Sequence, residues 1–171
     1  MEVIEQGQLK ISGIPCEGPP FRLQIRQGFN SHGYMKAGIW VPEEIRREIR
    51  PDMQVILELE AGAPVFCGVV KRAAAGKEKG QDCVYLEAET GSSLLDRKKK
   101  NRSFQRQGRT YKELVGEIAA PYQGYPVWET GAGGEKECGF LLQYGETDWE
   151  FLRRVLSAEG NGLLPESRFP G

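Results

Sequence analysis

Apolar and polar residues alternate through much of the first ninety positions, and this alternation predicts β-strands. Phe21, Leu23 and Ile25 alternate with arginines and a glutamine over 21–26. Over 53–60 the apolar positions are 53, 55, 57 and 59, with glutamates at 58 and 60. Successive side chains of a strand point to opposite faces, so the pattern is typical of antiparallel strands with one buried face. Further strands are expected at 34–41, 65–70 and 83–88.

Two connections between these strands have recognisable compositions. The segment 73–82 combines two glycines with several charged residues, which indicates a long hairpin with an exposed tip. Pro42, followed by Glu43 and Glu44, suits the first turn of a short helix that ends before Pro51. Five or six short strands without alternating helices predict a small antiparallel barrel or sandwich over 1–92.

Beyond Gly91 the apolar spacing changes to that of helices. Thr110 and Glu113 have the spacing of a capping box, in which each side chain bonds a free backbone N–H of the first turn. Apolar residues at 111, 114, 115 and 118 then share one face, and Pro121 ends the pattern. A first helix is therefore predicted from Thr110 onward.

A second capping box, formed by Thr147 and Glu150, predicts a helix that buries the apolar residues at 149, 152, 155 and 156. Between the helices, short strands are expected at 125–128 and 139–144, joined by a glycine-rich turn at 131–134. Residues 110–171 are thus predicted to form a small α+β domain with two capped helices. The segment 93–109, between the two domains, is predicted to be a basic connector.

Length and charge exclude several classes of protein. The chain has 171 residues, with 23 lysines and arginines against 24 aspartates and glutamates, and a net charge of −1. This balance offers no global attraction to nucleic acid or to an anionic membrane. No apolar run approaches the ~20 residues that span a bilayer. The acidic first residues predict that no signal peptide is present.

The residues available for catalysis and metal binding are few. His32 is the single histidine, so a catalytic triad or a histidine-based metal site would depend on it alone. The four cysteines include no Cys-x-x-Cys pair, and reduced, mostly buried thiols are expected, with a Cys67–Cys83 bridge as the alternative. The sequence therefore predicts no catalytic residue, no metal site and no cofactor.

A basic run is the first of two charged clusters that bear on function. Seven basic residues lie between Arg97 and Arg109, and one reading is an arm that binds a polyanion. Phe104 is the only aromatic residue in this run, so it lacks the stacking positions that nucleic-acid sites interleave with charge. A solvated connector is the interpretation that we prefer.

The second cluster contains Glu146, Asp148 and Glu150, which are close enough in sequence to suggest a carboxylate pair for glycoside hydrolysis. The predicted helix start explains two of them without catalysis. Asp148 favours the positive end of the helix dipole, and Glu150 completes the capping box. We therefore expect helix capping rather than an enzyme.

Several short motifs resemble a known family. They are Leu-Leu-Asp at 94–96, Arg-Ser-Phe-Gln at 102–105, and Thr-Tyr-Lys-Glu-Leu at 110–114. A more specific motif begins with Gln-Tyr at 143–144, continues through the capped helix, and ends with Glu-Gly at 159–160. Together with the apolar strand 65–70, they resemble the late control D and VgrG-like tail hub proteins of contractile phage tails and related injection systems. The resemblance covers 53–160.

The resemblance implies a small antiparallel β-barrel followed by a small α+β domain, and a structural role. Family members form a homotrimeric hub in which each subunit supplies two similar barrels, so that six barrels meet the hexameric tail tube and three-fold symmetry meets the spike. Tail tube and spike proteins are therefore the expected partners, and nucleic acid is not. The protein would be made in the cytoplasm and assembled into a tail or injection particle.

The chain shows strand patterns for only one barrel, so a hub would need a second barrel from further sequence or from another chain. Two other classes of function stay open at this point. One is a small nucleic-acid-binding barrel that uses the Arg97–Arg109 arm. The other is a carboxylate hydrolase that attacks cell-wall glycan.

Overall fold

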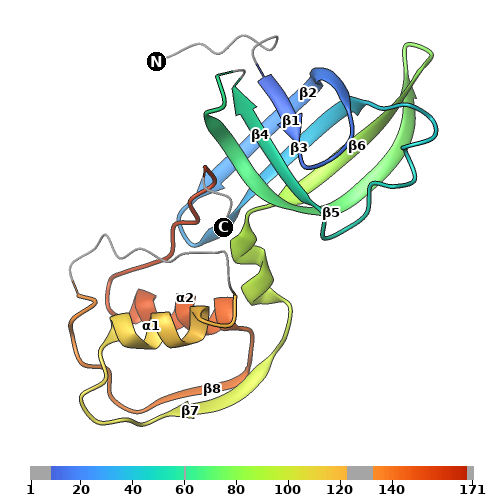
Figure 1. The fold of residues 1–171 in the computed structure, drawn as a ribbon. Coiled ribbons are helices and arrows are strands. Elements are labelled where there is room, and N and C mark those ends of the chain that lie inside the picture. The colour runs from blue at the N-terminus through green and yellow to red at the C-terminus, as the bar shows by residue number, and fades with distance from the viewer. Residues whose placement is uncertain (1–8, 60, 123–132, 169–171) are drawn as a thin grey trace. The chain divides into compact units, whose positions relative to one another are not determined.

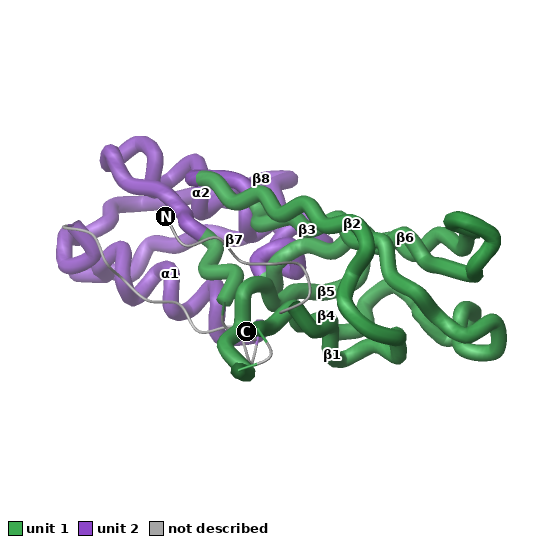
Figure 2. The backbone as a smooth tube through the Cα atoms, turned by 90° about the horizontal axis from the view of Figure 1, so that it is seen from above, with its two compact units in different colours: residues 1–28, 32–91, 165–170 green, residues 29–31, 92–164, 171 purple. Residues whose placement is uncertain are grey.

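The computed structural model describes residues 9–59, 61–122 and 133–168 (Figure 1). Contacts between residues divide the chain into two compact units, which are coloured separately in Figure 2. The first unit contains the described residues up to 28, those from 32 to 91, and 165–168. The second contains 29–31 and the described residues from 92 to 164.

The first unit is a six-stranded sheet in the order β1-β4-β5-β6-β3-β2. Its strands are β1 Leu9–Ser12, β2 Glu17–Gly28, β3 Ser31–Trp40, β4 Gln54–Leu59, β5 Pro64–Glu78 and β6 Gln81–Glu89. The pairs β1–β4, β4–β5, β5–β6 and β6–β3 are antiparallel. Strands β1 and β2, at the two ends of the order, also contact each other, so the sheet curls into a nearly closed barrel (Figure 1). The predicted antiparallel barrel is confirmed.

The barrel interior is filled by one face of each strand. Along β4, Val55 and Leu57 are fully buried, whereas the residue after each, Ile56 and Glu58, is only half-buried. The same alternation holds over 21–26 in β2, as the sequence predicted. The largest fully buried side chains of this core are Met35, Ile39, Val55, Leu57, Phe66, Val70 and Leu86.

The long hairpin predicted around 73–82 is present, and its tip is shorter than that segment because β5 and β6 stay paired up to a turn at Lys79 and Gly80. Both turn residues have positive φ, which matches the right-handed twist of the flanking strands. The helix expected after Pro42 is a series of turns over 43–48, in which Arg46 N donates to Pro42 O. Strand β1 was not predicted.

The second unit packs two helices over one face of a two-stranded sheet (Figure 1). Its elements are the 3-10 helix η2 Gly91–Asp96, whose first residue still belongs to the first unit, β7 Lys100–Phe104, α1 Tyr111–Ala119, β8 Leu141–Glu146 and α2 Asp148–Ala158. Both predicted capping boxes are present, at Thr110 and at Thr147. The fully buried core side chains include Leu114, Ile118 and Phe151, and the Phe104 ring stacks on Phe151 with centroids 5.2 Å apart.

Several expectations for the second half change. Residues 93–109, expected to be a connector, contain most of η2 and strand β7, which pairs with β8. The polar sequence of β7 concealed it, since its Lys100 and Arg102 face a buried carboxylate rather than an apolar core. The strand expected at 139–144 lies at 141–146. The strand expected at 125–128, and the turn at 131 and 132, fall outside the described residues.

Candidate functional site

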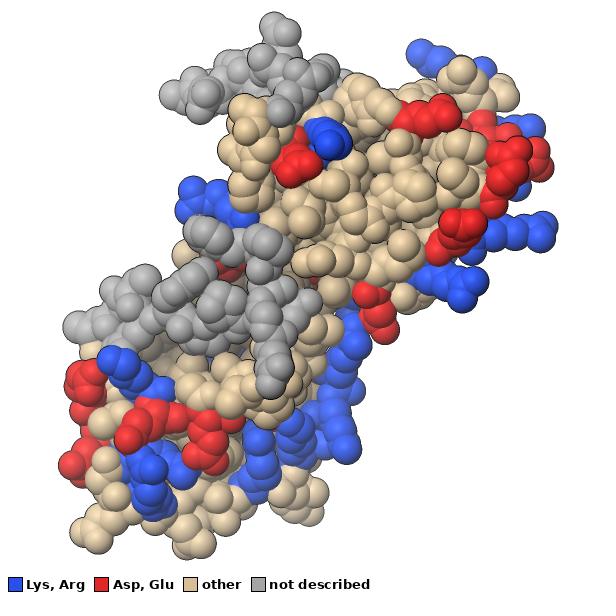
Figure 3. Space-filling view, in the orientation of Figure 1, with Lys and Arg blue, Asp and Glu red and all other residues tan. Residues whose placement is uncertain are grey.

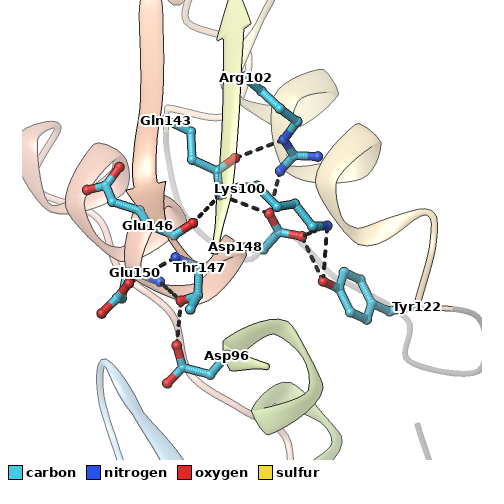
Figure 4. Close-up of polar contacts among 9 residues, drawn as sticks. All are labelled: Asp96, Lys100, Arg102, Tyr122, Gln143, Glu146, Thr147, Asp148 and Glu150. Atoms are coloured by element: carbon cyan, nitrogen blue, oxygen red, sulfur yellow. Dashed lines mark hydrogen bonds and ion pairs between the residues drawn. The ribbon is translucent and has the colours of Figure 1, made fainter. Parts of the chain in front are cut away.

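The most unusual group in the second unit is a buried carboxylate at the start of α2. The Asp148 side chain has no exposed surface, yet it follows the N-cap residue Thr147 directly. Lys100 Nζ donates to its Oδ2 at 2.6 Å and Tyr122 Oη donates to the same oxygen at 2.7 Å. Its Oδ1 accepts from Gln143 Nε2 at 3.0 Å and from Arg102. Figure 4 shows the four donors converging on this one side chain.

The strand register brings these donors together. Arg102 on β7 stands opposite Gln143 on β8, and Arg102 Nε donates to Gln143 Oε1 at 2.8 Å. Gln143 is fully buried and also donates to the backbone oxygen of Glu146 at 3.1 Å. A buried polar group costs free energy unless its hydrogen bonds are made. In this cluster the polar side chains form those hydrogen bonds with one another. The cluster therefore joins β7, β8, α2 and the chain after α1.

The charges of this cluster determine the ionisation of its carboxylate. Burial by itself would raise the pKa of Asp148. Hydrogen bonds from Lys100, Gln143 and Tyr122, and the charge of Arg102, outweigh burial and hold the pKa below its usual value. Asp148 is therefore an anion at neutral pH, and it is shielded from solvent by its partners.

The other two carboxylates of the sequence cluster are also occupied. Arg154 binds Glu146 through Nε and Nη2, each at 2.7 Å, and this pairing lowers the pKa of Glu146. Glu150 accepts from the Thr147 backbone N–H at 2.9 Å, as the capping box requires. Thr147 Oγ1 in turn donates to Asp96 at the end of η2. Both Glu146 and Glu150 line an open hollow of about 610 Å³, but Arg154 holds the first and the capping box holds the second, so we interpret them as structural supports.

The motifs that carried the sequence resemblance converge on the same contacts. Asp96 bonds the N-cap, Arg102 and Gln143 bond Asp148, and Phe104 stacks in the core. At the opposite end of α2, Tyr111 Oη donates to Glu159 Oε1 at 3.0 Å. The motif residues thus hold the second unit together, and this role accounts for their spacing along the chain.

Most of the basic run is neutralised by carboxylates within the second unit. Lys100 and Arg102 pair with Asp148, Arg106 pairs with Glu113, and Arg109 pairs with Glu117 at 2.9 Å. Lys98 and Lys99 are exposed and have no carboxylate partner in the described part of the chain. Figure 3 shows lysine and arginine side chains gathered on the second unit beside β7. The free positive charge is therefore concentrated before β7 rather than spread along an arm.

The structure also reveals a surface that the sequence analysis missed. Phe140, Leu142 and Tyr144 are 65%, 49% and 76% exposed. They occupy alternate positions in and next to β8, and the helices cover the other face of this strand. The sequence contained a signal, since three large apolar residues alternate there with Leu141 and Gln143; we assigned the strand but not the face that it exposes.

No reactive thiol or metal cluster is found among the described residues. Cys67, Cys83 and Cys138 are buried and Cys16 is half-buried, and all four thiols are free, so the Cys67–Cys83 bridge is absent. Burial raises the pKa of the Cys67 thiol to about 11, which keeps it protonated at neutral pH. In the described ranges, no three His, Cys, Asp or Glu side chains gather as metal ligands. The helices described are too short and polar to cross a membrane.

Comparison with known families gives a match over most of the chain. The model of the family described as Phage tail baseplate hub (GPD) matches residues 41–164. Among curated proteins, none matches the sequence.

Solved structures share the fold at low sequence identity. The prophage MuSo2 43 kDa tail protein from Shewanella oneidensis superposes with a TM-score of 0.68 at 13% identity, over 92% of this chain and 52% of its own. A tail protein from Neisseria meningitidis MC58 gives a TM-score of 0.66 at 16% identity, over 92% and 48%.

A third similar structure is the E. coli c3393 protein, a component of the type VI secretion system with structural similarity to the T4 bacteriophage tail proteins gp27 and gp5. It gives a TM-score of 0.60 at 17% identity, over 87% of this chain and 42% of its own. The present chain thus spans about half the length of the solved structures that it matches.

Proposed function

Because this chain belongs to the phage tail baseplate hub family, we propose that it is a subunit of a homotrimeric hub that joins the hexameric tail tube to a three-fold spike. The family match over 41–164 is the observation that carries this proposal. A structural role in a tail agrees with the sequence resemblance to late control D and VgrG-like proteins. The subunit would be made in the cytoplasm and become part of a phage tail or a related injection particle.

The barrel of the first unit is the part that we assign to the tube. A trimer that meets a hexamer must offer six similar surfaces, which requires two barrels in each subunit. The described residues contain one barrel. The proposal therefore includes a second barrel, supplied by sequence outside these 171 residues or by another chain.

A closed three-fold ring also requires two different faces on each subunit, because each copy must bind the next in a heterologous manner. The second unit supplies a rigid support for such a face, since its sheet and helix are tied to Asp148 by four donors. In this proposal the protein acts by surface complementarity, and no reaction is assigned to it.

The nucleic-acid alternative has less support in the structure than in the sequence. Non-specific affinity depends on basic side chains that are free to meet phosphates. Lys100, Arg102, Arg106 and Arg109 are each bound to a carboxylate of the same unit. We therefore keep the hub as the proposed function.

Light scattering tests the proposal on the 171-residue chain alone, and again together with the second barrel and the neighbouring tube and spike proteins. We expect a monomer or weak self-association for the chain alone, and the mass of a trimer once the second barrel is present. A stable dimer in both preparations would overturn the hub, since a two-fold assembly does not match a three-fold spike.

A further inference from the structure

The outer face of the β7–β8 sheet is an apolar surface that no other described segment of the chain covers. Leu142 and Tyr144 project from this face of β8, and Phe140 precedes them at the next alternate position. The inward-facing Gln143 is fully buried, so the two sides of the strand differ sharply. Two strands with a bare apolar face do not form a stable layer alone, and apolar side chains gathered on one exposed face mark an interaction surface.

The neighbouring strand supplies uncharged polar groups to the same face. Asn101 stands opposite Tyr144 and Ser103 stands opposite Leu142, and both β7 residues are exposed. Asn101 Oδ1 accepts from the Gly145 backbone N–H at 2.7 Å, which fixes the end of the sheet. The centre of the surface is therefore apolar, it carries no charge, and it is held by backbone pairing.

Free positive charges lie at one end of this surface. Lys99 and Arg153 line the same open hollow of about 610 Å³ as Gly145, the residue after Tyr144. Glu146, Glu150 and Arg154 line it too, but Arg154 pairs with Glu146 and the capping box holds Glu150. Lys98, Lys99 and Arg153 are exposed and have no carboxylate partner in the described ranges. A complementary surface must combine apolar groups with unpaired carboxylates.

The chain itself carries such a surface. Glu43, Glu44 and Glu48, in the turns after β3, are exposed and have no cationic partner in the described part of the chain. The same turns hold Arg46, which pairs with Asp82 at 2.9 Å, and the exposed Arg47, so the three glutamates outnumber the remaining positive charge. The half-buried Ile45 lies among them. With a net charge of −1, two copies of the chain experience little overall repulsion.

We propose that the β7–β8 outer face, with Lys98, Lys99 and Arg153 at its end, binds the turns 43–48 of a second copy of this chain. The contact is heterologous, so its repetition can close a ring. The inference rests on the proposed hub, and it identifies the two surfaces by which one subunit binds the next. We expect this contact to be weak in the isolated chain, in agreement with the weak self-association expected for it above.

Photo-crosslinking captures a weak contact and identifies its partner surface. A benzophenone side chain replaces Tyr144 in one copy, and a second, isotope-labelled copy distinguishes crosslinks between chains from those within one. We expect crosslinks between chains that map to the turns 43–48. Crosslinks from position 144 to position 144, or crosslinks within one chain only, would overturn the pairing.

Charge exchange supplies the second measurement. Lys98→Glu with Lys99→Glu should reduce the yield of crosslinks between chains by about tenfold, as should Glu43→Lys with Glu44→Lys in the other copy. Mixing the two reversed chains should restore the yield. Unchanged yields in the single reversals, or a mixture that fails to recover, would contradict the charge pairing.

The apolar part has a matched control. Leu142→Ser should lower the yield, whereas Leu164→Ser, at a residue that is 63% exposed and does not belong to β8, should not. Loss of crosslinks on adding a single-stranded oligonucleotide at physiological salt would assign the face to nucleic acid instead.

The complete hub distinguishes this inference from the proposed function. If it forms a trimer that Leu142→Ser leaves intact, the β7–β8 face is not the subunit contact, although the protein is still a hub. If no trimer forms in any preparation, the hub fails as well.

Discussion

Lys100 Nζ lies 2.6 Å from Asp148 Oδ2, so the first residue of β7 and the first residue of α2 are joined by an ion pair whose carboxylate is fully buried. The pair links positions 48 residues apart in the sequence. It explains why a strand as polar as β7 is stable beside the core of the second unit. Substitution of Asp148 measures what this ion pair contributes to the free energy of unfolding.

Asp148→Asn should lower the free energy of unfolding by about 3 kcal/mol, the low end for breaking a buried pair, because both cations keep partial contact with solvent. The side chains of Lys100 and Arg102 are 23% and 30% exposed. Chemical denaturation measures the change. Glu135→Gln, which removes an exposed pair with Lys112, is the control and should change stability by less than about 1 kcal/mol.

The same variant should show a defined pH dependence. The folded pKa of Asp148 is lowered, so its contribution is complete above the unfolded value of about 3.9 and is lost as the pH falls through the folded pKa. The difference in stability between the natural chain and Asp148→Asn should therefore be constant near neutral pH and shrink below about pH 4. A difference that is the same at pH 3 and pH 7 contradicts the ionised state that we assign.

Cap and core substitutions in α2 should separate by magnitude. Thr147→Ala removes the N-cap and should cost about 1 kcal/mol, whereas Phe151→Ala empties a fully buried site and should cost about 3–5 kcal/mol. Thr147→Ser keeps the hydroxyl and should restore most of the first loss. Thermal unfolding of the three variants gives the order, and a reversed order would show that Phe151 is not a core residue.

Two glycines should respond oppositely to alanine. A Cβ on Gly68 would lie 2.3 Å from the Glu89 backbone oxygen, so Gly68→Ala must displace a strand and should destabilise the barrel by about 1–3 kcal/mol. A Cβ on Gly116, inside α1, meets open space, and Gly116→Ala should stabilise that helix by up to about 1 kcal/mol. Equal effects measured by denaturation would argue against this close approach.

Binding to nucleic acid should be weak and sensitive to salt. Fluorescence anisotropy with a labelled oligonucleotide should show no sub-micromolar affinity at ~150 mM salt, because most of the basic run is already paired. Lys98→Ala with Lys99→Ala should remove whatever binding persists at low salt. Tight binding at ~150 mM salt that depends on these lysines would return the polyanion function to first place.

Hydrolase activity should be absent. Glu146 is held by Arg154 and Glu150 by the cap, so neither is available as a proton donor or nucleophile. Incubation with peptidoglycan and with a chromogenic glycoside tests this expectation. Turnover that disappears in Glu146→Gln would overturn it.

Local signals predicted the helices, while contacts between distant residues decided the rest. The capping boxes at Thr110 and Thr147 depend on residues three apart, so the sequence alone was sufficient to place both helix starts. Strand β7 has no apolar alternation, because its inner residues face Asp148. Arg102 and its partner Gln143 are 41 positions apart, and periodicity carries no information about such a pair.

The Asp148 cluster was also missed, because it depends on contacts between residues that are distant in the sequence. The helix dipole was a sufficient reason for an acidic residue at 148, and nothing in its immediate neighbours indicated burial. Two basic residues spaced by two, at 100 and 102, were the available signal, since that spacing places both on one face of a strand. This spacing is informative only if the basic run is interpreted as a strand, and we had interpreted it as a connector.

The chain leaves the barrel unit near residue 91 and re-enters it at 165, where Gln27 Nε2 donates to Pro165 O at 2.6 Å. The second unit is therefore an insertion, tethered at both ends. Docking the returning segment closes a loop of roughly seventy residues, which costs about 4 kcal/mol of chain entropy if that loop is unfolded. A folded insertion fixes the separation of its ends beforehand and reduces this cost. Folding of the insertion therefore stabilises the barrel by lowering the entropy cost of closing this loop. This effect does not require any side-chain contact.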